Sequence, residues 1–535
     1  MVDHVQHAAH ADLPARQTAT ERLINIGVVA LLLVGIAYVL IALVSDIDQG
    51  TKVVSWMPFI LLGVALLIAL GFEFVNGFHD TANAVATVIY THSLPPTVAV
   101  VWSGVCNFLG VLTSSGAVAF GILALLPVEL ILQVGSSAGF SMVFALLIAA
   151  IIWNLGTWYL GLPSSSSHTL IGSIIGVGLA NQLMAPAASG TSGVDWAQAA
   201  GIGQSLLISP IVGFVAAALL LLSAKALIRS PQLYREPQGR KPPPFWIRGL
   251  LVLTCTGVSF AHGSNDGQKG MGLIMLILIG TVPTAYALNR SMDAQDTVVF
   301  RSLSETTAEA IARYVPAGAP SSARPRDDLT AYVRDRQIKP ETLPALRGVA
   351  LDIATDVSRY GSLAKVPTEL VGNVRNDMYL VSEALRLMLK NNAVPFTAED
   401  LSLVRQYRGR LDQATKFIPD WVKVAVAIAL GLGTMVGWRR IVVTVGEKIG
   451  KSHLTYAQGA SAELVAMTTI GAADIFGLPV STTHVLSSGI AGTMAANRSG
   501  LQMATIRNLI LAWVLTLPVS IVLAGSLYWL FRHMF

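Results

Sequence analysis

Two stretches of this 535-residue chain place ionisable side chains inside apolar sequence, at residues 71–94 (GFEFVNGFHDTANAVATVIYTHSL) and 257–280 (GVSFAHGSNDGQKGMGLIMLILIG). They match at an offset of 186 residues, which pairs Asp80 with Asp266. Carboxylates and carboxamides are suitable ligands for protons, Na⁺ or Mg²⁺, and such groups are costly within a membrane unless they serve a site. The candidate coupling-ion residues are Asn76, His79, Asp80, Asn83, His262, Asn265 and Asp266.

A second pair of segments carries hydroxyl groups, at 161–181 (GLPSSSSHTLIGSIIGVGLAN) and 477–497 (GLPVSTTHVLSSGIAGTMAAN), at an offset of 316. Proline followed by serine or threonine predicts a helix start, and a helix N-terminus binds anions through free N–H groups and its positive dipole. Two such ends would hold a tetrahedral oxyanion. The candidate substrate-binding residues are Ser164, Ser165, Ser166, Ser167, Ser481, Thr482, Thr483 and Lys269.

Each of these motifs also has a structural explanation. Buried asparagines join membrane helices, and hydroxyl groups cap helices without binding any substrate. Duplication of both motifs favours the functional interpretation. Lys269 replaces Asn83 in the repeat, and it could either pair with Asp266 or neutralise an anion. His168 and His484 are as consistent with structural hydrogen bonding as with ligand binding.

Composition assigns the chain to the membrane. Hydrophobic residues make up 53% of it and charged residues 13%, with a mean hydropathy of +0.61, which excludes an ordinary soluble enzyme. Basic residues gather in short loops, a topology signal that argues against nucleic-acid binding. Cys106 and Cys255 both lie in apolar segments, which argues against a disulfide framework or a zinc site. We likewise expect no permanent metal site and no cofactor. Residues 446–452 (GEKIGKS) lack the P-loop spacing, which argues against ATP hydrolysis.

The order of segments predicts an N-terminal tail (1–22), a first membrane half (23–228) and a basic cytoplasmic linker (229–248). The second membrane half starts at 249–290 and resumes at 417–535. Between them, residues 291–416 hold 33 charged residues with apolar positions at helical spacing, as in a soluble helical domain. The two motif offsets differ by 130 residues, close to the 126 residues of this insert, so the halves are colinear repeats.

Loop charges predict that the repeats are inverted. The loop at 127–139 has no Lys or Arg, whereas its counterpart at 438–453 has four. We therefore expect an all-α polytopic membrane protein with inverted-topology repeats, with broken or re-entrant helices (the first broken at Asn76-Gly77) and with an inserted soluble domain. If each aspartate-bearing segment crosses the membrane once, the insert lies outside. If each crosses twice, the insert lies inside and the arginines at 439–440 violate the positive-inside rule.

The motifs resemble those of the inorganic phosphate transporter (PiT) family, especially its bacterial low-affinity branch. They are NGFHDTANAVATVIYT from Asn76, WNLGTWYLGLPSSSSHTLIGSIIG from Trp153, FAHGSNDGQKGMGL from Phe260 and GLPVSTTHVLSSG from Gly477. The resemblance implies secondary transport of phosphate at the cell (inner) membrane. It further implies proton-coupled uptake of neutral metal-phosphate complexes in bacteria and Na⁺ coupling in animals. The family's Asn-Asp motif is Asn265-Asp266 in the second half but His79-Asp80 in the first, a departure toward proton chemistry.

The working hypothesis places phosphate between the two hydroxyl-bearing helix starts, with protons or Na⁺ held by the two aspartates. A divalent metal could enter with the phosphate. Glu73 and His79 are candidate proton carriers, and Glu463 and Asp474 candidate relay groups. A sulfate or other tetrahedral oxyanion carrier, a Na⁺-coupled phosphate symporter and a membrane sensor that signals through the insert are the alternatives. The expected partners are inorganic phosphate and membrane lipid, without nucleic acid, and a homodimer is left open.

Overall fold

The computed structural model describes residues 19–48, 57–126, 128–132, 136–185, 193–239, 241–292 and 294–534. Most of the predicted N-terminal tail, residues 1–18, lies outside this part of the chain, as does the side chain of Asn83. Within the described residues the structure is helical, and its one β-bridge pairs Gly450 with Leu501. The predicted all-α class is therefore confirmed.

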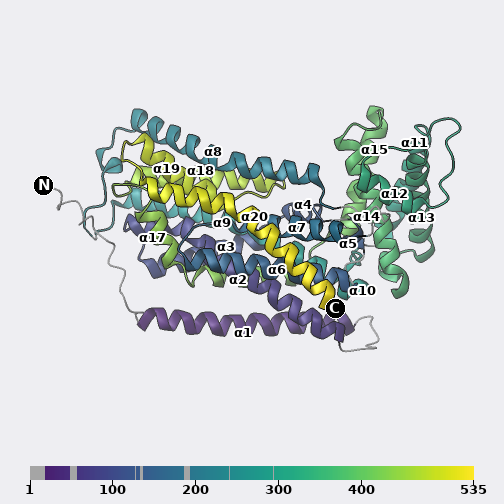
Figure 1. Ribbon diagram of the computed structural model, residues 1–535, viewed down its shortest axis with the longest axis horizontal. Coiled ribbons are helices and arrows are strands. Elements are labelled where there is room, and N and C mark those ends of the chain that lie inside the picture. The colour runs from purple at the N-terminus through teal and green to yellow at the C-terminus, as the bar shows by residue number, and fades with distance from the viewer. Residues whose placement is uncertain are drawn as a thin grey trace.

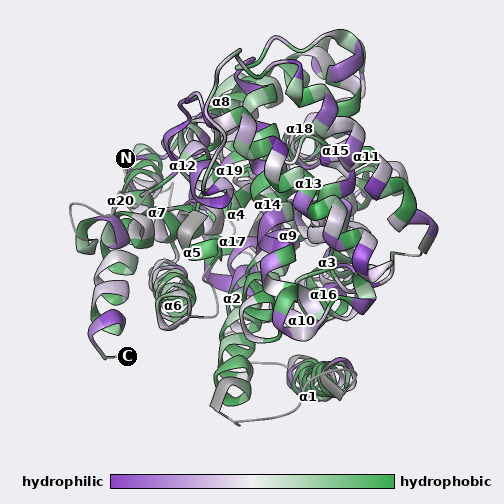
Figure 2. Ribbon diagram, turned by 90° about the vertical axis from the view of Figure 1, so that its right-hand side faces the viewer, coloured by the Kyte–Doolittle hydropathy of each residue, from purple (hydrophilic) through white to green (hydrophobic). Residues whose placement is uncertain are grey.

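The first half contains α1 (Ala19–Asp48), α2 (Met57–Tyr90), α3 (Pro96–Thr113), α4 (Ala117–Leu123), α5 (Val128–Leu132), α6 (Ser137–Tyr159), α7 (Ser166–Met184), α8 (Trp196–Leu227) and η1 (Pro231–Tyr234). The second contains α9 (Phe245–Thr281), α10 (Pro283–Tyr286), α16 (Asp420–Thr434), α17 (Arg439–Glu447), α18 (Tyr456–Ile475), α19 (Thr482–Ala496) and α20 (Met503–Met534). Among the described residues, seven helices are long and apolar enough to cross a membrane, or eight if the bent pair α15 and α16 forms one span. Figure 2 shows the largely hydrophobic α1 at the edge of the bundle.

Between α9 and α16, the charged segment forms α11 (Ala294–Ala312), α12 (Pro325–Asp335), α13 (Thr342–Tyr360), η2 (Leu363–Lys365), α14 (Thr368–Lys390) and α15 (Ala398–Thr415). These helices gather at one end of the molecule, beyond the long apolar helices (Figure 1). Their buried positions, such as Leu346, Met378 and Leu411, recur at helical spacing and build a core between them.

The expected break at Asn76-Gly77 is wrong, because α2 is one continuous helix through both residues. Gly77 instead permits close packing: a Cβ added there would lie 2.3 Å from the backbone oxygen of Leu430 in α16. Its repeat partner Gly263 packs α9 onto α3 in the same way, with an added Cβ 2.2 Å from the backbone oxygen of Asn107. The chain breaks instead between α3 and α4, where Gly116 takes a left-handed conformation (φ 85°).

Close packing at Gly77 gives a stability prediction. Gly77→Ala should lower the thermal unfolding midpoint in detergent by the equivalent of about 1–3 kcal/mol, because the new methyl group meets backbone that cannot rotate away. Gly71→Ala, on the same helix, is the matched control, since an added Cβ there meets nothing within 4 Å. It should be neutral or stabilising by up to about 1 kcal/mol. Equal midpoints for the two variants would contradict the packing role.

Helices α2 and α9 run antiparallel. Along α2, Glu73 lies against Gly270 of α9, and further along Asp80 lies near His262. Beyond that, Thr87 of α2 and Thr254 of α9 both donate to Glu463. Matched helices with opposite directions agree with an inverted duplication. The inversion of the two whole halves stays a prediction.

Because α9 is a single helix, the linker before it and the insert after it lie at opposite ends of the membrane domain. The basic loop at residues 438–453 lies at the same end of the membrane domain as the linker. Tyr90, the last residue of α2, donates a hydrogen bond to Glu447 of α17, and Arg248, at the end of the linker, donates to the backbone of Ser93, just after α2. Both basic loops therefore share one side, which the positive-inside rule assigns to the cytoplasm. The insert is then expected on the outer side.

Cysteine labelling in intact cells tests this topology. Ser402→Cys, on the exposed face of α15, should react with a membrane-impermeant maleimide. Gln238→Cys, exposed in the linker, should react only after the cells are permeabilised. The native Cys106 and Cys255 are buried, which keeps the background low. The reverse labelling pattern would place the insert in the cytoplasm.

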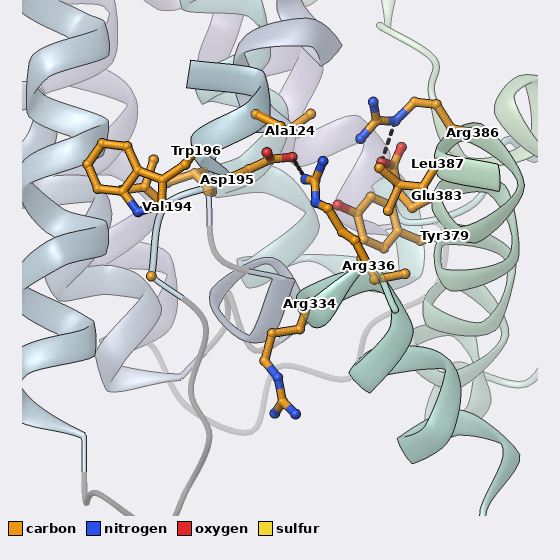
Figure 3. Close-up of a pocket in the computed structure, with 14 residues that line it drawn as sticks. Ala124, Val194, Asp195, Trp196, Arg334, Arg336, Tyr379, Glu383, Arg386 and Leu387 are labelled. Carbon is orange, nitrogen blue, oxygen red and sulfur yellow. Dashed lines mark hydrogen bonds and ion pairs between the residues drawn. The ribbon is translucent and has the colours of Figure 1, made fainter. Parts of the chain in front are cut away.

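The insert docks on the membrane domain around a cavity of about 240 Å³. There Arg336, which ends α12, forms an ion pair with Asp195, the N-cap of α8, and Arg386 pairs with Glu383 in α14 (Figure 3). Burial disfavours the charged form of Glu383, but Lys416 and Arg386 together hold its pKa below the ordinary value. The ion pair between Arg336 and Asp195 thus joins the insert to α8, which itself packs against α19.

Candidate functional site

The two matched aspartates lie together in the interior, positioned by α2 and α9. Atom Nε2 of His262 lies 3.8 Å from Oδ2 of Asp80 and 3.6 Å from Oδ2 of Asp266. On the other side of the ring, Nδ1 contacts Oδ1 of Asn107 in α3 at 2.7 Å, which fixes the ring between the acids. All four side chains are at least 96% buried. One ligand atom from each of Asp80, His262 and Asp266 lies within 4.8 Å of the others, so the three could bind one cation.

The hydroxyl-rich segments begin α7 and α19, as the sequence predicted. Ser165 and Ser481 are the N-caps, and their hydroxyl groups accept hydrogen bonds from the backbone N–H groups of His168 and His484. For these two serines, the capping explanation given above applies directly. Capping leaves the next hydroxyl residues available for other contacts.

Ser167 and Thr483 occupy matching positions in these helices, and each turns toward an acid of the opposite half. Thr483 donates a hydrogen bond to Oδ1 of Asp80. Ser167 accepts a hydrogen bond of 2.5 Å from Nζ of Lys269, which in turn lies 2.7 Å from Oδ1 of Asp266. The first-half acid is therefore joined to the second-half helix start, and the second-half acid to the first-half helix start.

The two helix starts also touch each other. Ser167 donates to the backbone oxygen of Val480, the residue before the N-cap of α19, at 2.8 Å. The rings of His168 and His484 lie 4.5 Å apart between centroids. First-turn N–H groups have no intrahelical acceptor, so both N-termini present donors to the same small volume.

The other predicted residues surround this centre. Ser164 contacts Thr157 at 3.0 Å, and His79 contacts Thr157 at 3.2 Å and Asp80 at 3.4 Å. Asn154 donates to Ser166 at 3.3 Å, and Asn265 donates to the backbone of Leu478 at 3.1 Å.

Two predicted polar groups have no such contact. Both amide atoms of Asn76 and the hydroxyl of Thr482 are buried without a hydrogen-bond partner among the described residues. Asn83 cannot be placed, because its side chain lies outside the described part of the chain. Lys269 is placed for both of its predicted roles. It forms an ion pair with Asp266, and it lies at the N-terminus of α7, where it could neutralise an anion.

Sequence reasoning missed two residues of the site. Asn107 orients His262, and Thr157 bridges His79 and Ser164. Both are polar side chains within apolar sequence, which is the signal that could have identified them. At the offset of 316, Thr157 has no polar repeat partner, because position 473 is an alanine, so a search guided by duplication passed over it.

The two candidate relay acids lie on α18, outside this centre. Glu463 accepts hydrogen bonds from Thr87 and Thr254, and Asp474 accepts from Ser264 at 2.6 Å and Gln268 at 2.5 Å. Both therefore join α18 to α9: Glu463 at Thr254, about two turns before His262, and Asp474 at Ser264 and Gln268, on either side of Asp266.

The centre has the groups needed to hold a small anion and cations at once. The helix starts offer hydroxyl and N–H donors, Lys269 offers a positive charge, and the aspartates offer oxygen ligands. A tetrahedral oxyanion and its charge-compensating cations match this set. All of these side chains are buried, so a substrate can reach them only after the protein opens.

Comparisons with known proteins agree with this chemistry. A family model described as the phosphate transporter family matches residues 76–524. The chain is 44% identical over 492 residues to the low-affinity inorganic phosphate transporter PitA of Escherichia coli strain K12, covering 88% of this chain and 96% of that protein. It is 40% identical over 506 residues to PitB of the same strain, with the same coverage. A solved structure titled as the sodium-dependent phosphate transporter aligns at a TM-score of 0.49 and 18% identity, covering 89% of this chain and all of that one.

Proposed function

The chain belongs to the phosphate transporter family, and we propose that it imports inorganic phosphate by symport with protons, through alternating access. It is a multi-pass inner-membrane transporter and not an enzyme. The observation that carries the proposal is the crossed contact of the two halves, in which Thr483 bonds Asp80 and Ser167 bonds the lysine that holds Asp266. An anion placed between the helix starts would thereby lie next to both acids.

Electrostatics explains why phosphate should enter with cations. Two aspartates and a divalent phosphate bring four negative charges, against one positive charge on Lys269. Moving each uncompensated negative charge against an inside-negative potential costs about 2.3 kcal/mol per 100 mV. Protons, or a divalent metal that enters bound to the phosphate, would remove this cost. The triad of Asp80, His262 and Asp266 offers ligands for either kind of cation.

Two histidines favour the proton over Na⁺. His79 stands where the second half has Asn265, and His262 lies between the two aspartates. Imidazole titrates near neutral pH and binds Na⁺ poorly, whereas an asparagine oxygen suits Na⁺. Proton coupling is therefore the version of symport that these residues support.

Alternating access would come from movement of the paired repeats. α7 packs on α20 and α19 on α8, while the acid-bearing α2 and α9 pack on α16 and α3. Rocking of the helix-start group against the acid-bearing group would open the buried centre to one side at a time. A homodimer stays a prediction.

Labelled phosphate uptake into proteoliposomes, with proton, Na⁺ and Mg²⁺ gradients imposed separately, tests the proposal. We expect an inward proton gradient to drive accumulation and a Na⁺ gradient to have no effect. Mg²⁺ outside should raise the rate if the metal complex is the substrate. Competition by excess sulfate checks the alternative oxyanion and should be weak. Accumulation driven by Na⁺ alone would overturn proton coupling.

A further inference from the structure

We infer that Glu73 carries the coupling proton, a role that rests on the proton symport proposed above. Glu73 lies in α2, two turns before Asp80, and its side chain is fully buried. Among the described residues, no group donates a hydrogen bond to either of its carboxylate oxygens. A buried acid with no donor is costly to keep ionised, so the position calls for an explanation.

The neighbouring helix has a notch that accommodates this carboxyl group. A Cβ added at Gly270 of α9 would lie 2.3 Å from Cγ of Glu73 and 2.5 Å from its Oε1. Any other residue at 270 would therefore displace the acid. Gly270 directly follows Lys269, so the notch places Glu73 beside the buried lysine of the substrate site.

Glu73 and Lys269 are both exceptions to the repeat. At the offset of 186, Glu73 matches Ser259, which makes a 2.8 Å hydrogen bond to Ser103, and Lys269 matches Asn83. The first half thus has an acidic residue that its repeat lacks, and the second half has a basic residue that its repeat lacks. The fold brings these two departures from symmetry to adjacent positions, which points to a shared role.

Charge balance identifies which acid keeps a proton. The charged or titratable groups that act on Glu73 are Asp266, Lys269 and His262, all on α9, and Asn76 is its polar neighbour on α2. The ammonium nitrogen Nζ of Lys269 lies 2.7 Å from Oδ1 of Asp266. Among the described residues, Lys269 is ion-paired with Asp266 and not with Glu73, and an ionised carboxylate left unpaired in the interior costs several kcal/mol. A proton on Glu73 therefore favours closure, most of all when phosphate adds further negative charge to the site.

Proton transfer at this residue needs no other reagent. When the site is open to the outside, a hydronium ion gives its proton to a carboxylate oxygen of Glu73 and leaves water. When the site is open to the inside, the carboxylic acid returns the proton to water. The empty protein, which lacks the negative charge of phosphate, returns with Glu73 ionised, so net proton movement is in one direction. Closure with phosphate bound then requires the proton, which couples the two fluxes.

Glu73→Gln separates this role from phosphate binding, because glutamine mimics the protonated acid but cannot release a proton. In proteoliposomes, the variant should keep phosphate–phosphate exchange within about twofold of the unmodified protein. It should lose proton-driven accumulation, which for one coupled proton reaches about tenfold per pH unit. Ser259→Ala, at the matched position of the other half, is the control and should keep both activities.

The outcomes distinguish this inference from the proposed function. If the unmodified protein accumulates phosphate with the proton gradient and Glu73→Gln does so equally well, Glu73 is not the carrier although proton symport stands. If the unmodified protein ignores the gradient, both fail. Loss of exchange as well in Glu73→Gln, with normal elution from a sizing column, would assign Glu73 to phosphate binding and overturn the inference. Should that variant not fold, Glu73→Asp replaces it, and the inference requires proton-driven accumulation to persist there.

Discussion

Asp80→Asn should abolish phosphate uptake while leaving the protein folded and inserted. Asparagine has nearly the same shape and still accepts the hydrogen bond from Thr483, so the contact between α2 and α19 survives. The negative charge that would hold a cation beside the phosphate, between the helix starts and His262, is lost. Loss of a charge-assisted contact worth about 3 kcal/mol corresponds to roughly a hundredfold lower uptake.

The control is Asp46→Asn, which alters another partly buried aspartate of the same membrane domain. Asp46 accepts hydrogen bonds from Tyr286 at 2.7 Å and Trp421 at 3.1 Å, and asparagine can accept both. It lies away from the substrate centre, so uptake should stay near that of the unmodified protein. Uptake by Asp80→Asn at the level of this control would refute the role of Asp80.

Lys269→Met should give the second large effect, on both stability and transport. The lysine side chain is 99% buried, and its ammonium group holds Asp266 and Ser167 together. Removing one partner of a buried ion pair leaves an uncompensated charge, which typically costs 3–5 kcal/mol. We therefore expect poor yield of folded protein and no uptake, measured by size-exclusion chromatography and proteoliposome transport.

A double variant separates the two effects of Lys269. In Lys269→Met with Asp266→Asn, no unpaired charge remains, so the unfolding midpoint should return to within about 1 kcal/mol of the unmodified protein. Uptake should stay absent, because the double variant lacks both the anion-facing cation and one acid. Recovery of uptake together with stability would show that Lys269 serves only to neutralise Asp266.

The sequence contained enough to predict the helical membrane class, the family and the meeting of the duplicated motifs. The reason is physical: polar residues such as Asp80 and Ser167 are so costly in apolar sequence that their presence indicates a buried site. Repetition then identified which of them should come together. The crossed arrangement, with each acid joined to the helix start of the opposite half, could not be predicted, because it depends on how the halves interleave.

Glycine was the residue type that misled the prediction. Asn76-Gly77 suggested a break in α2, but the missing side chain at Gly77 serves contact with the backbone of α16. A glycine in a sequence does not reveal whether its freedom is used for a turn, as at Gly116, or for close approach. Only the position of the neighbouring helix separates the two. The same limit applies to Gly270, whose role in making room for Glu73 is visible only in three dimensions.

Crystals grown with arsenate, a heavier tetrahedral analogue of phosphate, offer the most direct test of the substrate site. The anomalous signal of arsenic locates the bound oxyanion without assumptions about the surrounding side chains. We predict one strong peak between the N-termini of α7 and α19, within hydrogen-bonding reach of Ser167 and Thr483 and next to Lys269. A peak confined to the cavity beside Arg336 and Arg386, with none between the helix starts, would contradict the central claim.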